Sequence, residues 1–510
     1  MRKIIRVLFS RYAISAIVIL LELFFIGMLS YRAYEYSVYA LIVFAVIDFL
    51  VVITLINLNA NPEYKVSWLV IVMLLPPFGA VLYALFYSRK LSGREAEKMK
   101  LIRENLTRDT SRGREIVDSL RATDPLAAGK LVSALSDDPL AMVFSCSASR
   151  YYSLGEDMLD DLIADILSAE KYIFLEYFII DEGEVWESLH SALLKKSDEG
   201  VSVRILYDDI GCMRTLPADF SEKLSKEGIE CRRFGRVTPR ISNAHNNRDH
   251  RKIAVIDGRI AYTGGVNIAD EYANKKIRFG HWKDGGVRIF GDAASGFLAQ
   301  FLSGWDLSGN GITDFEPLKC KEEFTSDGGL YLTLGTGPAP IYKRSAAKRI
   351  LLDIINQAKE YIYMTTPYLI IDYELTEALA AAARRGVDVR IITPGIPDKR
   401  LVKLMTKSSY PYLVGEGVAI YEYSPGFIHE KTVVSDDVYA LVGTVNLDYR
   451  SLVHHFEDAV LIYRSPTAID IKEDLLKTVS ISLRCSDDKA RLTLPERIVR
   501  NLIRLFAPLL

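Results

Sequence analysis

Two copies of one pattern of reactive side chains stand out in the chain. Each copy has a histidine, a lysine two residues later and an aspartate five residues after that, and an asparagine follows each histidine by 17 residues. The residues are His250, Lys252, Asp257 and Asn267 in the first copy, and His429, Lys431, Asp436 and Asn446 in the second. Because the chain has only seven histidines, two such matches at identical spacing indicate a duplicated functional site.

This set of side chains suits attack on a phosphodiester. One neutral imidazole, that of His250 or His429, can attack phosphorus and form a phosphohistidine, while the other protonates the departing alkoxide. Lys252 and Lys431 can stabilise the charge on the non-bridging oxygens, each contact at ~4 Å being worth roughly 4 kcal/mol of gross Coulomb energy at an effective dielectric of about 20. The two asparagines can bind the same phosphate oxygens through neutral hydrogen bonds.

Four carboxylates complete the candidate site. Asp284 and Glu457 occupy matching positions when the apolar residues after the two motifs are aligned, and each can bind the far ring nitrogen of a histidine and fix its tautomer. Asp257 and Asp436 are included among the catalytic residues as motif members, although each stands where a strand ends and can instead hold a turn. A nucleophile and an acid of this kind need neither a metal nor another cofactor, and we expect none.

The chain around the motifs is repeated as well. Residues 169–209 and 358–395 each contain an apolar run, an amphipathic stretch that ends at Gly200 or Gly386, and a second apolar run, which predicts two parallel strands joined by a helix. The run after each histidine is typical of a buried strand, on which positions i and i+2 share a face. We therefore expect an α/β fold with two pseudo-symmetric lobes of mixed β-sheets flanked by helices, which bring both motifs to one cleft. The two copies are called the first repeat (residues 169–289) and the second repeat (residues 358–462).

The first 90 residues are far more apolar than the rest and predict a transmembrane helical anchor. Apolar stretches run over about 13–29, 38–58 and 66–87, and each is near the ~20 residues that cross the hydrocarbon core of a bilayer. Pro76, Pro77 and Gly79 interrupt the third stretch, which can be kinked or re-entrant. Basic residues on both sides of this region favour an even number of crossings, so two and three spanning helices both stay open, as does the side of the membrane that holds the body.

The remaining chain divides by composition. We expect a charged helical linker over 91–138, the first lobe over 139–330, the second lobe over 331–485 and a basic amphipathic helix over 486–510. In the last segment Arg497, Arg500 and Arg504 recur at helical spacing among apolar residues, which fits a helix on an anionic membrane surface and equally a helix packed on the body.

Composition argues against several classes of protein. A net charge of −2 gives no whole-chain argument for binding nucleic acid. The five cysteines are odd in number and show no CxxC spacing, which disfavours a disulfide framework and a structural zinc site.

The doubled motif resembles that of the phospholipase D superfamily, and the resemblance to its bacterial cardiolipin synthases covers nearly the whole chain. The segments that carry it are Asn61–Phe86, Phe174–Gly183, Asn246–Tyr272, Arg278–Asp284, Tyr368–Asp372, Pro425–Thr432, Gly443–Ser451 and Leu505–Leu510. The resemblance implies a multi-pass enzyme of the bacterial cytoplasmic membrane that converts two phosphatidylglycerol molecules into cardiolipin and glycerol. It also implies that His250 is the nucleophile, that His429 is the acid and base, and that Asp284 and Glu457 orient them.

Other functions remain open beside this one. A phospholipase D hydrolase has the same motif residues and differs only in using water as the acceptor, so that phosphatidic acid is its product. A nuclease is disfavoured by the apolar segments and the near-neutral charge. A catalytically inactive membrane scaffold usually loses a motif residue, whereas all eight are present here. The oligomeric state is left open.

Overall fold

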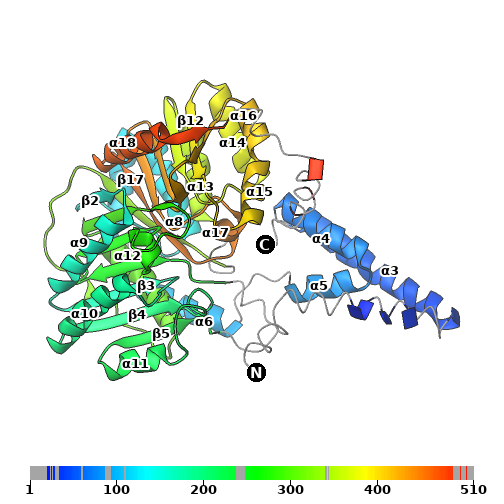
Figure 1. The fold of residues 1–510 in the computed structure, drawn as a ribbon, viewed down its shortest axis with the longest axis horizontal. Helices are drawn as coiled ribbons and strands as arrows, with labels where there is room; N and C mark the ends of the chain where they lie inside the picture. The colour runs from blue at the N-terminus through cyan, green and yellow to red at the C-terminus, as the bar shows by residue number, and fades with distance from the viewer. Residues whose placement is uncertain are drawn as a thin grey trace. The chain divides into compact units, whose positions relative to one another are not determined.

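The structure is a computed structural model in two compact units, an N-terminal unit formed mainly by residues 1–89 and a body formed by residues 90–236 and 246–500 (Figure 1). It describes residues 20–485 apart from 23, 26, 29–33, 59–60, 87–92, 108–110, 237–246, 339–341 and 343, and it also describes 494, 495, 501 and 503. Most of the first expected apolar stretch and of the expected C-terminal helix, 486–510, lies outside the described residues.

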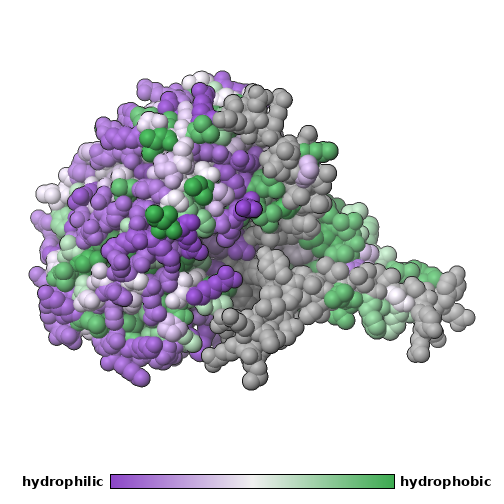
Figure 2. All heavy atoms as spheres, in the orientation of Figure 1, coloured by the Kyte–Doolittle hydropathy of each residue, from purple (hydrophilic) through white to green (hydrophobic). Residues whose placement is uncertain are grey.

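The N-terminal unit is helical. Its helices are α3 (Tyr34–Asn57), α4 (Pro62–Leu74) and α5 (Phe78–Phe86). Within the described residues, Val38–Asn57 is the one helical segment that is long and apolar enough to cross a membrane, with a mean hydropathy of 2.8. In Figure 2 much of the coloured surface of this unit is green, which marks apolar side chains. The described part of the chain thus supports one span.

The third apolar stretch is divided, as its Pro76–Pro77 pair predicts. Helix α4 has 13 residues and α5 has 9, so each is shorter than the ~20 residues of a spanning helix. The side-chain oxygen of Asn61 accepts the backbone N–H of Glu63 at 2.9 Å and caps the start of α4. A small apolar cluster holds the three helices together; it consists of Leu55, Tyr64, Trp68, Val72 and Leu82.

The first repeat builds most of a seven-stranded mixed sheet. In spatial order its strands are β2 (Ser147–Tyr152), β9 (Gly286–Gly291), β7 (Ile260–Gly264), β6 (Lys252–Ile256), β3 (Tyr172–Tyr177), β4 (Ser202–Asp208) and β5 (Glu230–Phe234). Strands β3 and β4 are parallel and are joined by α10 (Glu184–Asp198), which confirms the predicted strand–helix–strand unit. Gly200 lies just past this helix with φ of +88°, a conformation that glycine adopts without strain.

The second repeat builds most of a nine-stranded mixed sheet. In spatial order its strands are β1 (Met142–Phe144), β10 (Leu330–Thr336), β17 (Glu457–Tyr463), β16 (Tyr439–Gly443), β15 (Thr432–Ser435), β11 (Tyr361–Thr365), β12 (Asp388–Pro394), β13 (Ala419–Tyr423) and β18 (Ser482–Arg484). Parallel strands β11 and β12 are joined by α14 (Tyr373–Arg384), again as predicted. Between its outermost strands, this sheet follows the strand order of the first one, with β10 in the place of β2.

Helices cover both sheets. The other helices of the body, including two short 3₁₀ turns, are α6 (Gly93–Leu106), α7 (Ser111–Thr123), α8 (Pro125–Asp137), α9 (Gly155–Leu167), α11 (Phe220–Lys226), η2 (Asp270–Ala273), α12 (Ala294–Leu307), η3 (Glu316–Leu318), α13 (Ala346–Gln357), α15 (Arg400–Ser408), α16 (Tyr410–Gly415), α17 (Tyr449–Val453) and α18 (Thr467–Ser480). Helices α12 and α18 each contact strands of both sheets, so a helical layer lies between them. Helices α9 and α10 cover the outer face of the first sheet, and α13 and α14 that of the second.

Three apolar cores fill the spaces between these layers. The central core contains residues of both sheets, of α12 and α18, and of α6. The expected linker, 91–138, is helical where it is described, and its apolar side chains are part of these cores. Met99, Ile102 and Leu106 of α6 lie in the central core, while Val117 of α7 and Leu131 of α8 lie in the core outside the second sheet.

Candidate active site

The two repeats hold each other's histidine backbones. The backbone N–H of His250 donates to the carbonyl of Phe456 at 2.9 Å, and the N–H of His429 donates to the carbonyl of Lys283 at 2.8 Å. The second contact continues a short parallel pair between β8 (His281–Lys283) and β14 (Gly426–Ile428). Each histidine is therefore positioned by a segment of the other repeat.

The histidine side chains are paired across the repeats in the same way. His250 Nδ1 lies 2.8 Å from Glu457 Oε2, and His429 Nδ1 lies 2.7 Å from Asp284 Oδ2. His250 and His429 are each 7 % exposed, whereas the two carboxylates are fully buried, Asp284 at 0 % and Glu457 at 1 %. A carboxylate on Nδ1 leaves Nε2 of each imidazole for chemistry, which is the orientation that acid–base and nucleophilic catalysis require.

A glycine makes room for one of these carboxylates. A Cβ on Gly265 would come within 1.9 Å of Asp284 Oδ1, so no larger residue fits there without moving the carboxylate. The same oxygen accepts the backbone N–H of Gly285 at 2.9 Å. Both carboxylate oxygens of Asp284 therefore have a hydrogen-bond partner, Oδ1 with Gly285 and Oδ2 with His429.

Lys252 and Lys431 are buried beside the histidines. Lys252 Nζ donates to the carbonyl of His250 at 2.7 Å, and Lys431 Nζ donates to the carbonyl of His429. Burial lowers the pKa of Lys252 to about 8, although Glu457 and other carboxylates oppose the shift. Burial lowers the pKa of Lys431 to about 7, which Asp284 opposes and the charge of Lys252 reinforces. The charge of Lys252, in the first motif, thus reaches Lys431 and His429 of the second motif, which indicates that the two motifs lie near one another.

Burial also keeps both imidazoles neutral in the free protein. It lowers the pKa of His250 to about 3, with Glu457 opposing, and the pKa of His429 to about 4, with Lys431 adding to the shift and Asp284 opposing it. Burial alone would raise the carboxylate pKa values, but the adjacent imidazoles hold the pKa of Glu457 and Asp284 below the usual range. A phosphodiester charge beside an imidazole favours its protonated form and so opposes the lowering of its pKa by burial.

The two motif aspartates lie at the far ends of their strands. Asp257 accepts the backbone N–H groups of Glu170, Lys171 and Tyr172 at 2.8, 2.8 and 2.9 Å, before and at the start of β3. Asp436 accepts three N–H groups at the start of β11 in the same way, at 2.8, 3.0 and 2.9 Å. Both have positive φ, 53° and 54°. This geometry supports the second of the two interpretations from the sequence, in which these carboxylates hold turns.

The asparagines are buried but differ in their contacts. Asn267 Oδ1 accepts the N–H of Ile179 at 3.0 Å, and its Nδ2 donates to the hydroxyl of Tyr272 at 2.8 Å. Asn446 Oδ1 is buried and has no hydrogen-bond partner among the described residues. Only the Nδ2–H groups of these amides can donate to a phosphate oxygen, so the partners of Oδ1 do not rank the two residues, and the phosphate-binding role of both stays a prediction.

The strands begin later than the sequence suggests. His250 precedes β6, which starts at Lys252, and both His429 and Lys431 precede β15, which starts at Thr432. The histidines therefore sit in the connecting segments that pair with the opposite repeat, where they are fixed by those contacts.

Two aromatic residues and one histidine near the site carry no assignment from the sequence. The ring of Tyr272 lies 5.5 Å from that of His429 and the ring of Trp282 lies 5.6 Å from it, measured between centroids. The ring of His455 lies 5.6 Å from that of His250. Aligning the residues before Asp284 with those before Glu457 places His455 opposite Trp282, which is the signal that could have found it.

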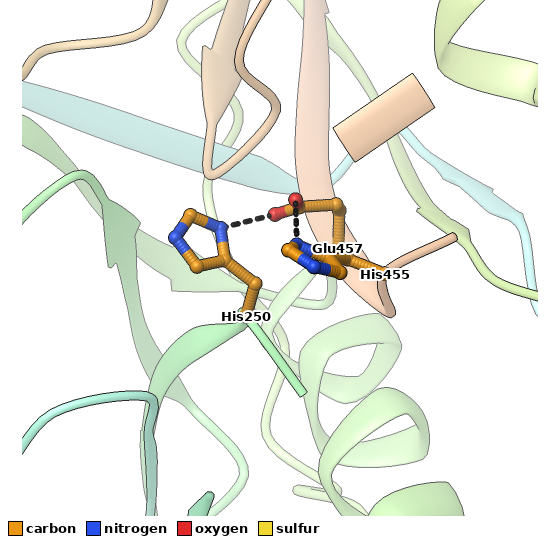
Figure 3. A group of neighbouring side chains, drawn as sticks. All are labelled: His250, His455 and Glu457. Carbon is orange, nitrogen blue, oxygen red and sulfur yellow. Dashed lines mark hydrogen bonds and ion pairs between the residues drawn. The ribbon is translucent and has the colours of Figure 1, made fainter. Parts of the chain in front are cut away.

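One group of metal-ligating side chains comes together within the described residues. His250, His455 and Glu457 offer nitrogen and oxygen atoms that lie within 4.8 Å of one another (Figure 3). The hydrogen bond between His250 and Glu457 already joins two of the three as an imidazole–carboxylate pair. The expected metal-free reaction stays a prediction.

Comparison with known proteins agrees with this geometry. A family model described as "Cardiolipin synthase, PLD-like domain" matches residues 162–276 and 351–478, and a model described as "Phospholipase_D-nuclease N-terminal" matches residues 41–86. A solved phosphatidylserine synthase from Haemophilus influenzae has a TM-score of 0.56 at 15 % identity and covers 75 % of this chain and 98 % of its own, which shows a shared fold.

Curated relatives are similar over most of the chain. A cardiolipin synthase from Staphylococcus aureus is 31 % identical over 87 % of this chain and 91 % of its own length. Cardiolipin synthase 2 from Bacillus anthracis is 32 % identical, with 89 % and 88 % covered, and an uncharacterised protein from Streptococcus mutans is 41 % identical, with 72 % and 80 % covered. The duplicated motif, the shared fold and these relatives together establish that the chain belongs to the cardiolipin synthase family of phospholipase D-like enzymes.

Proposed function

We propose that the protein transfers a phosphatidyl group between two phosphatidylglycerol molecules and so makes cardiolipin and glycerol. The observation that carries this proposal is the pair of buried imidazole–carboxylate contacts formed across the two repeats, with a lysine beside each. Two such imidazoles supply one nucleophile and one acid to a single phosphorus atom.

In the first half-reaction His250 is the nucleophile. Its Nε2 attacks the phosphorus of phosphatidylglycerol, the bond from phosphorus to the glycerol oxygen breaks, and protonated His429 gives its proton to that oxygen. Free glycerol leaves and a phosphatidyl group stays on His250. Lys252 and Lys431 balance the charge on the non-bridging oxygens, aided by Asn267 and Asn446.

In the second half-reaction His429 is the base. It takes a proton from a glycerol hydroxyl of a second phosphatidylglycerol, whose oxygen attacks phosphorus while the bond to His250 breaks. Cardiolipin is released and the starting protonation states return. Asp284 and Glu457 orient the two imidazoles throughout, and no metal or cofactor takes part in the proposal.

The architecture behind this reaction is proposed to be two pseudo-symmetric lobes, residues 139–330 and 331–485. The shared strand order of the two sheets supports this division, and so do the crosswise contacts of the histidines. Asp257 and Asp436 act in this arrangement by fixing the far ends of β6 and β15.

The protein is proposed to be a multi-pass protein of the bacterial cytoplasmic membrane. Residues 1–90 form its anchor, residues 91–138 connect the anchor to the body, and residues 486–510 form a basic helix at the lipid surface. The apolar segment Val38–Asn57 and the divided third stretch support an anchor. Phosphatidylglycerol and cardiolipin are the expected lipid partners, with no nucleic acid.

The test is product analysis with purified full-length protein in detergent micelles that contain phosphatidylglycerol. Mass spectrometry is expected to find cardiolipin and glycerol in equal amounts, and neither with His429→Ala. Phosphatidic acid as the dominant product would refute the transferase and leave a hydrolase. Unchanged turnover in His250→Ala would indicate that the lipid chemistry comes from another protein and leave this chain as a scaffold.

A further inference from the structure

The two buried carboxylates differ in what holds their second oxygen. Asp284 Oδ2 binds His429, and Asp284 Oδ1 accepts the N–H of Gly285. Glu457 Oε2 binds His250, but Glu457 Oε1 is buried and has no hydrogen-bond partner among the described residues. A buried carboxylate oxygen that lacks a donor costs on the order of 1–3 kcal/mol, so a donor is expected there.

The imidazole of His455 can supply this donor. Its Nδ1 lies 3.6 Å from Glu457 Oε1, and it too is without a hydrogen-bond partner among the described residues. His455 is 9 % exposed, and Figure 3 shows its ring and that of His250 approaching Glu457 from different sides. A shift of a few tenths of an ångström would bring the two atoms within hydrogen-bond distance, and such contacts often tighten only when substrate binds.

The equivalent place in the first repeat carries no such donor to the carboxylate. Trp282 takes the position of His455, with its ring at the same 5.6 Å from the catalytic imidazole, but no hydrogen bond joins its indole N–H to Asp284. The backbone of Gly285 provides the donor for Asp284, whereas Asp458 stands at the matching position after Glu457. A side chain is therefore needed for Glu457 where a backbone N–H suffices for Asp284.

We propose that His455 is a positioning residue for the reaction at His250. Its Nδ1–H donates a hydrogen bond to Glu457 Oε1 and so fixes the carboxylate that accepts His250 Nδ1–H. No proton is transferred between these three residues. The orientation matters most when His250 becomes positively charged as the phosphoryl group joins its Nε2, because Glu457 then balances that charge. The inference rests on the proposed function only in its first half-reaction, the formation of the phosphatidyl-enzyme.

Two variants of nearly equal size test this role. His455→Asn places an amide N–H where Nδ1 was, and His455→Leu removes the donor at similar volume. Formation of the phosphatidyl-enzyme is measured by rapid alkaline quench of full-length protein with ³²P-labelled phosphatidylglycerol. We expect His455→Leu to slow it about 10–100-fold with little change in KM, and His455→Asn to recover most of the rate.

The outcomes separate positioning from packing. Equal losses in the asparagine and leucine variants, or a normal rate in the leucine variant, would overturn the proposal. If His455→Leu unfolds, His455→Phe keeps the ring volume without the donor and takes its place. His190→Leu serves as the control, because His190 pairs with Glu227 on another surface and its loss should leave the rate unchanged.

This test is independent of the acceptor. A wild-type enzyme that forms the phosphatidyl-enzyme but releases phosphatidic acid would refute cardiolipin synthesis and leave the expected His455 effect intact. A wild-type enzyme that makes cardiolipin while His455→Leu behaves normally would refute the positioning role alone.

Discussion

The two motif histidines, His250 and His429, have similar arrangements of neighbours, but the chemical types of those neighbours differ. Each imidazole receives a carboxylate from the opposite repeat, at 2.8 Å for His250 and 2.7 Å for His429. In the second repeat, the ionisable residues His455 and Asp458 lie close to Glu457 in the sequence. In the first repeat, Asp284 is flanked by Lys283 and Gly285. The His429 side also carries the indole of Trp282 against the imidazole.

A duplicated motif therefore need not give two equivalent sets of neighbours. In the proposed reaction one imidazole carries a phosphoryl group and the other carries a proton, and these roles place different demands on the neighbouring charges. The crosswise contacts are the same for both histidines and bring the two imidazoles and carboxylates together. The different residues beside each carboxylate can make one imidazole suited to each role. Variants that change the neighbours of one histidine only can test whether the two sides differ.

The largest effect is expected from the histidines themselves. His250→Ala and His429→Ala should each lower kcat by about 10⁶-fold, because loss of either member disables the unit. Alkaline-quench labelling distinguishes them, since His250→Ala has no atom to carry the label. A stable label on the His250→Ala variant would reverse the proposed roles.

Next in size are the carboxylates. Glu457→Gln and Asp284→Asn should each cost about 10⁴-fold in kcat, because an amide can no longer fix the required tautomer. The crosswise contacts predict that Glu457→Gln mainly slows formation of the phosphatidyl-enzyme. Asp284→Asn should slow both its formation and its transfer to the acceptor. Stopped-time labelling with and without added glycerol measures the two steps, and equal patterns in both variants would argue that the two sides are equivalent.

A smaller effect comes from the lysines through pH. The pKa of Lys431 is about 7 and that of Lys252 about 8, so both lose their charge as pH rises through this range. We expect kcat/KM to fall on the alkaline side by roughly tenfold per pH unit once Lys431 is neutral. Lys431→Arg keeps its charge and should move the first step of this decline to higher pH. A profile that stays flat up to pH 9 in the wild type would contradict the expectation.

The smallest effect on chemistry is expected at the motif aspartates. Asp257→Ala removes an acceptor for three backbone N–H groups and should lower the free energy of unfolding by about 1–3 kcal/mol, with kcat changed only a few-fold. Asp436→Ala should cost less, because its hydrogen bonds are more exposed. Thermal unfolding in detergent checks the order, and a loss of kcat as large as for the carboxylates would restore these residues to the catalytic group.

Sequence reasoning predicted the repeated strand–helix–strand units because their apolar runs and terminal glycines, Gly200 and Gly386, are local signals. It also identified the carboxylates Asp284 and Glu457 from their matching positions. It did not predict which carboxylate contacts which histidine. Such a contact depends on how the two repeats pack, and the spacing of residues along the sequence does not report it.

The same reasoning did not predict that the segment after the anchor, residues 91–138, packs into the cores of the body. Residues 91–138 look like a charged linker by composition, yet apolar residues such as Met99, Ile102 and Leu106 recur on one side of α6 and pack into the central core. His455 was missed for a related reason, since a single histidine beside a paired carboxylate has meaning only once the opposite repeat is in place.

The crosswise carboxylates have a consequence for ancestry. A protein with a single copy of the motif would hold an imidazole whose carboxylate pointed away from it, and it would be inert as a monomer. Two identical subunits meeting about a twofold axis would exchange carboxylates and become active, at a concentration set by their affinity. Fusion of the duplicated gene removes that dependence on concentration and allows each half to drift toward one task.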